Sequence, residues 1–468
     1  MEEVFLSETE SICPRCFTAI PAHRVALGDR VYLRKTCPEH GPFEAVIWRG
    51  QPAYSSWVRP KIPSYPKAPA TLVEKGCPLD CGLCPEHRQH TCTALIEVTQ
   101  RCDLRCAFCF ADAGNKDSGD PALEDFKEQF DRLFASAGPC NVQLSGGEPT
   151  LRDDLPEIVV LGRSTGFSFI QINTNGLRLA KDPSYVEALK EAGLASVFLQ
   201  FDGMEDTVYR KLRGRELFRE KRRAIEHCAE RGIGVVLVPT LVPGVNTSQI
   251  GPIIEFALQE LPAVRGVHFQ PVSYFGRFPY PPRDEDRITI PEIITEIETQ
   301  TGGRIRAEHF KPPGCENALC SFHGNFVLLT DGALRPWTQC QSEDCGCKPF
   351  PAAEGAAKAR LFVSQFWSPP KAGQLSSVKV DAPSFGAWDD FLIRARTHSL
   401  CISGMAFQDA WNLDLDRLKD CCIHIVHPDG RLVPFCAYNA TDSEGRSHYR
   451  DNGSGFSRTR KGPAGETA

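Results

Sequence analysis

The sequence lacks the features that mark membrane and secreted proteins. No run of about 18 apolar residues occurs in it, and the acidic start, MEEVFLSETE, has no apolar stretch of the kind found in secretion signals. It also lacks any long Lys/Arg run, and its formal net charge is -6, so the charge pattern does not indicate binding to nucleic acid or to an anionic membrane. We therefore expect a soluble cytoplasmic protein with no transmembrane segment, whose partners are small molecules or individual proteins.

Cysteine, in contrast, is abundant, with 21 residues in a chain of 468. Disulfides are rare in proteins that are not exported, and most of these cysteines stand in close-spaced clusters, which favours metal ligation. Three isolated cysteines, Cys140, Cys228 and Cys401, are more typical of small buried hydrophobic residues.

The first segment, residues 1–52, contains CPRC (Cys13, Cys16) and CPEHG (Cys37, His40) around a strand-like VYLRKT. This pattern predicts a small metal-binding knuckle that holds either a structural zinc or a rubredoxin-like mononuclear iron. Residues 53–92 then form a linker with further cysteines, because a Pro-rich stretch at 51–70 favours extended backbone.

Residues 93–282 alternate between apolar strand-like runs and amphipathic stretches. Six strands are predicted, at 93–99, 140–146, 167–174, 195–202, 233–240 and 264–272. Helices are predicted between them, at 122–137, 183–193, 216–232 and 247–260. This order indicates an α/β fold with a parallel sheet curved into a partial (β/α)6 TIM-like barrel, in which chemistry is expected at the C-terminal strand ends.

The pattern becomes irregular beyond residue 283. A helix is predicted at 288–300 and a strand at 325–332, and we expect residues 283–440 to cover the substrate or to bind a metal cluster. The last stretch, 441–468, is polar and rich in Gly and Ser, which predicts a disordered tail.

Two motifs carry the expected chemistry. The first is CDLRCAFC, which places Cys102, Cys106 and Cys109 directly after the first barrel strand. Three thiolates on one loop can hold three irons of a four-iron cluster and leave the fourth open, whereas a structural zinc site would have four ligands, more often as CxxC pairs. The second motif is SGGEPTL after the second strand, where Gly146 and Gly147 would let the backbone approach a ligand.

Together these motifs resemble the radical S-adenosylmethionine (radical SAM) superfamily, including the aromatic Phe108 just before the third cysteine. The resemblance implies an oxygen-sensitive 4Fe-4S cluster on Cys102, Cys106 and Cys109, whose open iron binds S-adenosylmethionine. It also implies a low-potential electron donor such as ferredoxin or flavodoxin. Contacts to S-adenosylmethionine are expected from Gly146, Gly147, Glu148, Asn175, Gln200, Asp202 and Arg213. Gln270 and Ser273, at the end of the sixth strand, are candidates to face the substrate.

Further cysteines indicate one or two auxiliary clusters. Cys77, Cys81 and Cys84 repeat the CxxxCxxC spacing, and Cys92 could close that cluster as a fourth ligand or leave it open. A second cluster is predicted from Cys315, Cys320, Cys436 and one of the pair Cys421 and Cys422, in a region that also contains Cys340, Cys345 and Cys347.

The flanking motifs narrow the resemblance to one subgroup. The knuckle, the two CxxxCxxC motifs and the late PFCAYN are similar to the subgroup that contains an archaeal 7,8-dihydro-6-hydroxymethylpterin methylating enzyme and the tetraether lipid synthases. No cobalamin-binding segment precedes the barrel, so the favoured function is cobalamin-independent radical methylation of a pterin-like molecule. The alternatives are carbon–carbon coupling of lipid tails, modification of a peptide, and a non-catalytic iron–sulfur or zinc protein.

Overall fold

Six parallel strands form the centre of the fold, as the sequence pattern predicts. The computed structural model describes residues 2–67, 69–114, 119–338, 349–369 and 387–453. The six strands are β6 (Thr93–Thr99), β7 (Asn141–Gly146), β8 (Ile170–Thr174), β9 (Ser196–Gln200), β10 (Gly234–Val238) and β12 (Val264–Pro271). Each neighbouring pair in this series runs parallel.

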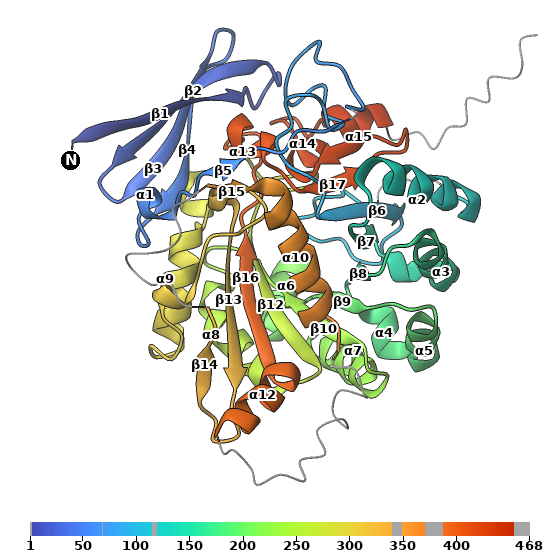
Figure 1. Cartoon of the computed structure of the whole chain (residues 1–468). Helices are drawn as coiled ribbons and strands as arrows, with labels where there is room; N and C mark the ends of the chain where they lie inside the picture. The colour runs from blue at the N-terminus through green and yellow to red at the C-terminus, as the bar shows by residue number, and fades with distance from the viewer. Residues whose placement is uncertain (1, 68, 115–118, 339–348, 370–386, 454–468) are drawn as a thin grey trace, which may run out of the picture.

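Helices connect these strands and cover the outer face of the curved sheet (Figure 1). In the first of them, Phe126, Phe130 and Leu133 recur at helical spacing and are fully buried, so the helix packs one apolar stripe against the strands. The connecting helices are α2 (Leu123–Ala137), α3 (Leu155–Thr165), α4 (Leu177–Lys181), α5 (Pro183–Glu191), α6 (Asp206–Arg213), α7 (Phe218–Glu230) and α8 (Ile250–Gln259). The four predicted helices are confirmed, whereas α3, α4 and α6 were not predicted.

The C-terminal third of the chain extends this sheet at both edges. Strand β16 (Ser399–Met405) pairs in parallel with β12, and β17 (Ile423–Val426) pairs in parallel with β6, so in Figure 1 the red strand β17 lies beside the blue strand β6. The prediction of an irregular, separate region beyond residue 283 is therefore wrong for these strands. Their apolar runs are short and scattered, and only pairing with distant strands makes them part of the sheet.

Over the described residues, the large sheet has the order β14-β13-β16-β12-β10-β9-β8-β7-β6-β17-β18, in which β6 and β12 do not pair, so the barrel is open. The remaining strands of the C-terminal region are β13 (Ser321–Leu328), β14 (Leu334–Pro336), β15 (Phe350–Pro351) and β18 (Leu432–Pro434). Its helices are α9 (Ile290–Gln300), α10 (Ala352–Phe366), α12 (Ala387–Thr397), α13 (Leu415–Lys419), α14 (Phe435–Asn439) and α15 (His448–Gly453). Helix α9 confirms the prediction at 288–300, and its start is fixed by Glu292, which accepts from the Thr289 backbone N–H (2.8 Å).

The N-terminal segment forms its own four-stranded antiparallel sheet. Its strands are β1 (Glu3–Ile12), β2 (Ala19–Leu27), β3 (Arg30–Cys37) and β4 (Gly41–Arg49). A buried ion pair fastens this sheet to the C-terminal region, because Arg24 Nε and NH2 donate to Asp414 at 2.7 and 2.9 Å. The linker adds the short helix α1 (Tyr54–Trp57) and strand β5 (Lys61–Ile62), which pairs with β15.

Part of the predicted disordered tail is folded. Tyr449 is 3% exposed and its hydroxyl donates to Pro78 O (2.6 Å), while Arg450 forms a buried ion pair with Glu97 of β6 (2.6 Å). The prediction of disorder is therefore wrong for residues 441–453, and 454–468 lie outside the described residues. None of the described helices is long and apolar enough to cross a membrane.

Candidate active site and metal centres

A cavity of about 810 Å³ lies inside the open barrel, at and below the C-terminal ends of its strands. Most of the residues predicted to bind the cluster and S-adenosylmethionine line this cavity: Cys102, Cys106, Cys109, Phe108, Gly146, Gly147, Glu148, Asn175, Gln200 and Arg213. Gln270 and Ser273 line it as well. The structure thus brings residues from the ends of five strands, β6, β7, β8, β9 and β12, to one cavity, as the position of the motifs predicts.

The cysteine loop after β6 is held by the backbone of a distant segment. Cys109 N and O pair with Arg277 O and N at 2.9 and 3.0 Å, and Arg277 Nε donates to Cys106 O (3.0 Å). Sequence reasoning missed Arg277, because nothing in its neighbourhood marks it as a partner of a loop about 170 residues earlier. Arg277 therefore fixes the shape of the loop, although it is not one of the residues expected to bind the cluster.

The two glycines of the SGGE motif allow close packing against the same loop. A Cβ on Gly146 would lie 2.3 Å from Thr99 O, and a Cβ on Gly147 would lie 2.1 Å from Arg101 O. The Gly147 and Glu148 N–H groups donate to the Thr99 and Arg101 carbonyls (both 2.8 Å). Both glycines line the cavity, but they also allow the backbone after β7 to pack directly against the cysteine loop. This packing was not predicted from the sequence.

Glu148 connects the second and third strand ends from a buried position. Its Oε1 accepts from the hydroxyls of Thr150 and Thr174 (both 2.6 Å), and its Oε2 accepts from Asn175 N (2.7 Å). Burial raises the pKa of Glu148, and these hydrogen bonds oppose that effect. The carboxylate therefore orders the rim of the cavity, where Asn175 Nδ2 also donates to Asp103 Oδ1 of the cysteine loop (2.6 Å).

Asp202 and Arg213 form a fully buried bidentate ion pair. Arg213 Nε and NH2 donate to Asp202 at 2.7 and 2.6 Å, and NH2 also reaches Thr240 Oγ1 (3.1 Å). Burial opposes the charge on Arg213, but Asp202 and then Cys106 raise the pKa of Arg213 far above its usual range. Of the two residues, only Arg213 lines the cavity. Asp202 lies on the side of Arg213 away from the cavity and so positions its side chain.

A buried lysine that the sequence analysis did not single out completes this rim. Lys221 of α7 is 0% exposed, and its Nζ donates to Asn175 O (2.5 Å) and Gln200 Oε1 (3.4 Å). Burial lowers the pKa of Lys221 to about 8. Its sequence context, EKRR, is typical of a solvated helix face, so no local signal could have identified it.

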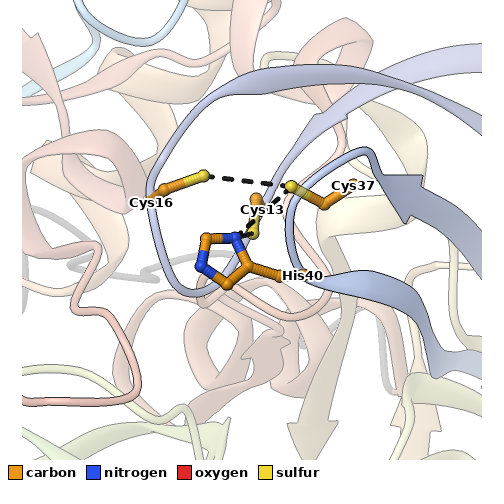
Figure 2. A group of neighbouring side chains, drawn as sticks. All are labelled: Cys13, Cys16, Cys37 and His40. Carbon is orange, nitrogen blue, oxygen red and sulfur yellow. Dashed lines mark hydrogen bonds between the residues drawn. The ribbon is translucent and has the colours of Figure 1, made fainter.

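The N-terminal knuckle brings Cys13, Cys16, Cys37 and His40 together, and in Figure 2 their side chains point toward one common centre. His40 Nδ1 lies 3.6 Å from Cys13 Sγ and 3.5 Å from Cys37 Sγ, and Cys16 Sγ lies 4.0 Å from Cys37 Sγ. Tetrahedral zinc, with bonds of 2.3 Å to sulfur and 2.0–2.1 Å to nitrogen, places its ligands roughly 3.5–3.8 Å apart. The four residues therefore fit one tetrahedral metal ion.

The two buried thiols of the knuckle differ in their pKa, because burial raises the pKa of Cys13 to about 11. Burial alone would raise the pKa of Cys37, but the hydrogen bond with His40 and neighbouring N–H groups lower it to about 6. The thiolate is the form of cysteine that binds metals. The set supplies four ligands and so would leave no open position on the metal.

Cys77, Cys81 and Cys84 lie together on one loop, as predicted. The adjacent Cys77 thiol and burial raise the pKa of Cys81, with a further contribution from Cys84. The Cys81 backbone N–H donates to the hydroxyl of Tyr449 (2.9 Å), so the folded tail covers this group.

Cys92 belongs to a different group from the one predicted. Its sulfur lies with those of Cys315 and Cys422, all within 4.8 Å of one another, and all three residues line the main cavity. The Cys92 and Cys315 sulfurs lie within bonding distance, yet their Cα atoms are 7.6 Å apart, beyond the usual disulfide range of about 4.4–6.8 Å. Convergence of three thiols at this separation fits a shared metal or cluster better.

The predicted set of Cys315, Cys320, Cys421 and Cys436 is accordingly divided. Burial, and then the charges of Cys436 and Cys320, raise the pKa of Cys421, which places these three near one another. Arg417 NH2 donates to Cys320 Sγ (3.4 Å), and Cys315 joins Cys92 instead. Segments about 100 residues apart meet here, so their spacing in the sequence carries no signal for which cysteines share a cluster. Cys340, Cys345 and Cys347 lie outside the described residues.

The three cysteines interpreted as packing residues are all buried. Cys140 and Cys228 belong to the main hydrophobic core, and burial raises the pKa of each thiol to about 12. Cys401 is also buried, but it lies on the cavity wall.

Comparison with known proteins supports this assignment of motifs. Residues 96–257 match the Radical SAM superfamily, and residues 5–49 match the HMPTM N-terminal zinc ribbon domain. The chain is 36% identical to the 7,8-dihydro-6-hydroxymethylpterin dimethyltransferase of Methanocaldococcus jannaschii, over 92% of this chain and 93% of that protein. It is 30% identical to a probable GTP 3',8-cyclase of Archaeoglobus fulgidus, over 52% of this chain and 83% of that protein.

Among solved structures, the chain resembles Streptococcus suis SuiB bound to precursor peptide SuiA. The TM-score is 0.38 and the sequence identity 18%, over 46% of this chain and 48% of that chain.

Proposed function

The chain belongs to the radical SAM superfamily and, within it, to the family of the archaeal pterin dimethyltransferase, and on that premise we propose that it methylates a pterin-like small molecule without cobalamin. When bound, the 4Fe-4S cluster and S-adenosylmethionine supply a 5'-deoxyadenosyl radical that can take a hydrogen atom from an unactivated carbon. The protein contributes the positions of the ligands, the shape of the cavity and the exclusion of water.

The chain's own residues are suited to these tasks. Cys102, Cys106 and Cys109 would hold the cluster at the cavity wall, and Arg213, next to Cys106, would place a fixed positive charge there. Asp103 holds the side chain of Asn175 and Lys221 holds that of Gln200, so both side chains are ordered before any ligand binds. We assign these residues, with Gly146, Gly147, Glu148 and Phe108, to S-adenosylmethionine, and Asp202 to the positioning of Arg213.

The remaining metal assignments are part of the proposal. We assign a metal ion, zinc or mononuclear iron, to the knuckle and an auxiliary cluster to Cys77, Cys81 and Cys84. We assign a second auxiliary cluster, which would face the cavity, to Cys92, Cys315 and Cys422. A low-potential donor such as ferredoxin or flavodoxin would supply the electrons.

The observation that carries the pterin proposal is the extent of the likeness to the archaeal dimethyltransferase. It covers 92% of this chain, far more than the barrel, and residues 5–49 match the HMPTM N-terminal zinc ribbon domain. A likeness restricted to the barrel would indicate only the shared radical chemistry.

The second candidate function is the coupling of lipid tails. It is favoured by the apolar side of the cavity, where Phe169, Phe198 and Trp367 pack beside α10. A lipid tail needs apolar contacts along its whole length, whereas polar carboxamide side chains lie beside these aromatic residues on the same strands.

The proposed function is tested by anaerobic incubation of the reconstituted protein with S-adenosylmethionine, strong reductant and 7,8-dihydro-6-hydroxymethylpterin, in the presence of a one-carbon donor fraction. We expect products heavier by one or two methyl groups in the mass spectrum, together with 5'-deoxyadenosine. If 5'-deoxyadenosine forms but the pterin is recovered unchanged, while lipid tails become coupled in a parallel reaction, the pterin assignment is wrong.

A further inference from the structure

The interior of the barrel carries a ladder of carboxamide side chains below the S-adenosylmethionine residues. Gln143 of β7 donates through Nε2 to Gln171 Oε1 of β8 (2.9 Å), and Gln171 Nε2 donates to Ser196 Oγ of β9 (3.2 Å). Gln143 precedes Gly146 by three positions and Gln171 precedes Asn175 by four, which is roughly 10–13 Å along a strand. We call Gln143, Gln171 and Asn173 the carboxamide ladder.

The upper end of this ladder has an acceptor that the described part of the chain does not satisfy. Asn173 Nδ2 donates to Gln143 Oε1 (3.3 Å) and approaches Ser145 Oγ (3.5 Å), but Asn173 Oδ1 is buried and has no hydrogen-bond partner. A buried acceptor without a partner costs about 1–3 kcal/mol. Because Asn173 lines the cavity, a ligand that donates an N–H group can remove this cost.

An aromatic wall lies in the same part of the cavity. Phe198 of β9 stacks with Trp367 after α10, with ring centroids 5.5 Å apart at 26°, and Phe169 belongs to the same cluster. His268 of β12 lies 5.3 Å from Phe198, and its Nδ1 is within 2.9 Å of Ser403 Oγ. We call Phe169, Phe198 and Trp367 the aromatic wall.

We propose that the carboxamide ladder and the aromatic wall form the subsite for the planar nitrogen heterocycle of the substrate, with an N–H edge directed at Asn173 Oδ1 and the ring plane against the wall. The inference rests on the proposed function, because it names the part of the cavity that holds a pterin-like ring. It assigns substrate recognition to strands β7, β8 and β9 at a level below the S-adenosylmethionine residues.

The ladder also bears on the choice between heterocycle and lipid. A hydrocarbon tail in this position would leave Asn173 Oδ1 without a donor and would desolvate the amides beside it. No new hydrogen bond would compensate for this cost in binding free energy. A ring that has both donors and acceptors on its edge and an aromatic face matches the carboxamide ladder and the aromatic wall at once.

The subsite is tested with Asn173→Thr. Threonine fits a strand and keeps a hydroxyl donor for Gln143, but it removes the carbonyl acceptor. The matched control is Asn412→Thr, which removes the carbonyl acceptor of a half-buried asparagine outside the cavity lining, where Oδ1 accepts from Asp409 N (2.8 Å). The reconstituted proteins are compared by anaerobic equilibrium dialysis against 7,8-dihydro-6-hydroxymethylpterin, guanosine and a long-chain fatty alcohol, with S-adenosylmethionine measured in parallel.

We expect the pterin to bind the wild type and the control alike, and to bind Asn173→Thr at least tenfold more weakly, with a loss confined to the heterocycle. If guanosine binds and the pterin does not, with the same tenfold loss in Asn173→Thr, the subsite is supported and the pterin assignment fails. If the pterin binds or is methylated equally well in both variants, the subsite is wrong although the proposed function stands. Binding of the fatty alcohol alone overturns both.

A second variant covers the case in which Asn173→Thr does not fold. Phe198→Leu keeps an apolar side chain of similar volume but removes the aromatic face. It should weaken binding of the heterocycle severalfold and change the absorption spectrum of the bound ring. Unchanged affinity together with an unchanged spectrum would exclude the aromatic wall as part of the subsite.

Discussion

Two cysteine sites in this chain have similar local spacing and opposite construction. The knuckle has four ligands, Cys13, Cys16, Cys37 and His40, that converge within 4.8 Å of one another and lie in the small antiparallel sheet. The loop of Cys102, Cys106 and Cys109 has three cysteines, all on the wall of the main cavity. A complete ligand set stabilises a fold, whereas an incomplete one that faces a cavity can bind a substrate. Under the proposed assignments, the contrast is one between a structural and a catalytic metal site.

The largest effect is expected from Gly147→Ala, which tests whether the catalytic loop depends on the second strand. The new Cβ would lie 2.1 Å from Arg101 O, so the loop must move by an ångström or more. We expect about a 100-fold loss of 5'-deoxyadenosine formation, because a displacement of that size disrupts a catalytic geometry. The control is Gly119→Ala, where nothing lies within 4 Å of the new Cβ. Equal activity of both variants would contradict the packing account.

Asp202→Asn should have the next largest effect, because it leaves the Arg213 charge buried without its carboxylate partner. Breaking a buried pair in this way costs about 3–5 kcal/mol of folding free energy, and we also expect weaker binding of S-adenosylmethionine. Chemical denaturation and ligand titration measure the two effects. Glu216→Gln removes an exposed partner of Arg210 and should cost less than about 1 kcal/mol. A similar small loss in Asp202→Asn would show that the buried pair does not support the rim.

A smaller, pH-dependent effect is expected from His268 in the cavity. Burial lowers the pKa of His268 to about 4, whereas an unfolded histidine has a pKa near 6.5. The unfolded chain therefore binds this proton first, so stability is lost as the pH falls from 6.5 toward 4, by up to about 3 kcal/mol. His268→Gln should reduce the acid sensitivity of the unfolding free energy over this window. An unchanged pH profile would contradict the burial of the ring.

The smallest effect on catalysis is expected at the knuckle. Cys16→Ser removes one of the four ligands, so the protein should bind one metal ion fewer and melt at a lower temperature. With a chemical reductant in place of a protein donor, formation of 5'-deoxyadenosine per bound cluster should stay close to that of the wild type. A large loss of cleavage under these conditions would mean that the two sites are coupled and that the knuckle is more than structural.

The parts of the fold that sequence could predict are those with local signals. The six central strands, α9 and the clusters at Cys13, Cys77 and Cys102 follow from short patterns, because each pattern lies within one element or loop or, at the knuckle, in two nearby loops. Strands β16 and β17 could not be predicted, since their place depends on pairing with β12 and β6. The same reason explains Cys92: its neighbours in space, Cys315 and Cys422, come from segments more than 200 residues away.

The same limit applies to side chains that support the site. Lys221 and Arg277 look like ordinary charged surface residues in the sequence, and only the tertiary structure brings them to the strand ends and the cysteine loop. The carboxamide ladder is similar, because glutamines on adjacent strands become partners only when the register of β7 and β8 is known.

The most direct test of the account is the cleavage of S-adenosylmethionine by Cys106→Ala. Wild type and variant are reconstituted with iron and sulfide under anaerobic conditions and reduced strongly, and 5'-deoxyadenosine is measured by chromatography. The account predicts formation of this product by the wild type and none above background in Cys106→Ala, with the metal of the knuckle retained. Cleavage that persists in Cys106→Ala would contradict the assignment of the open cluster to Cys102, Cys106 and Cys109.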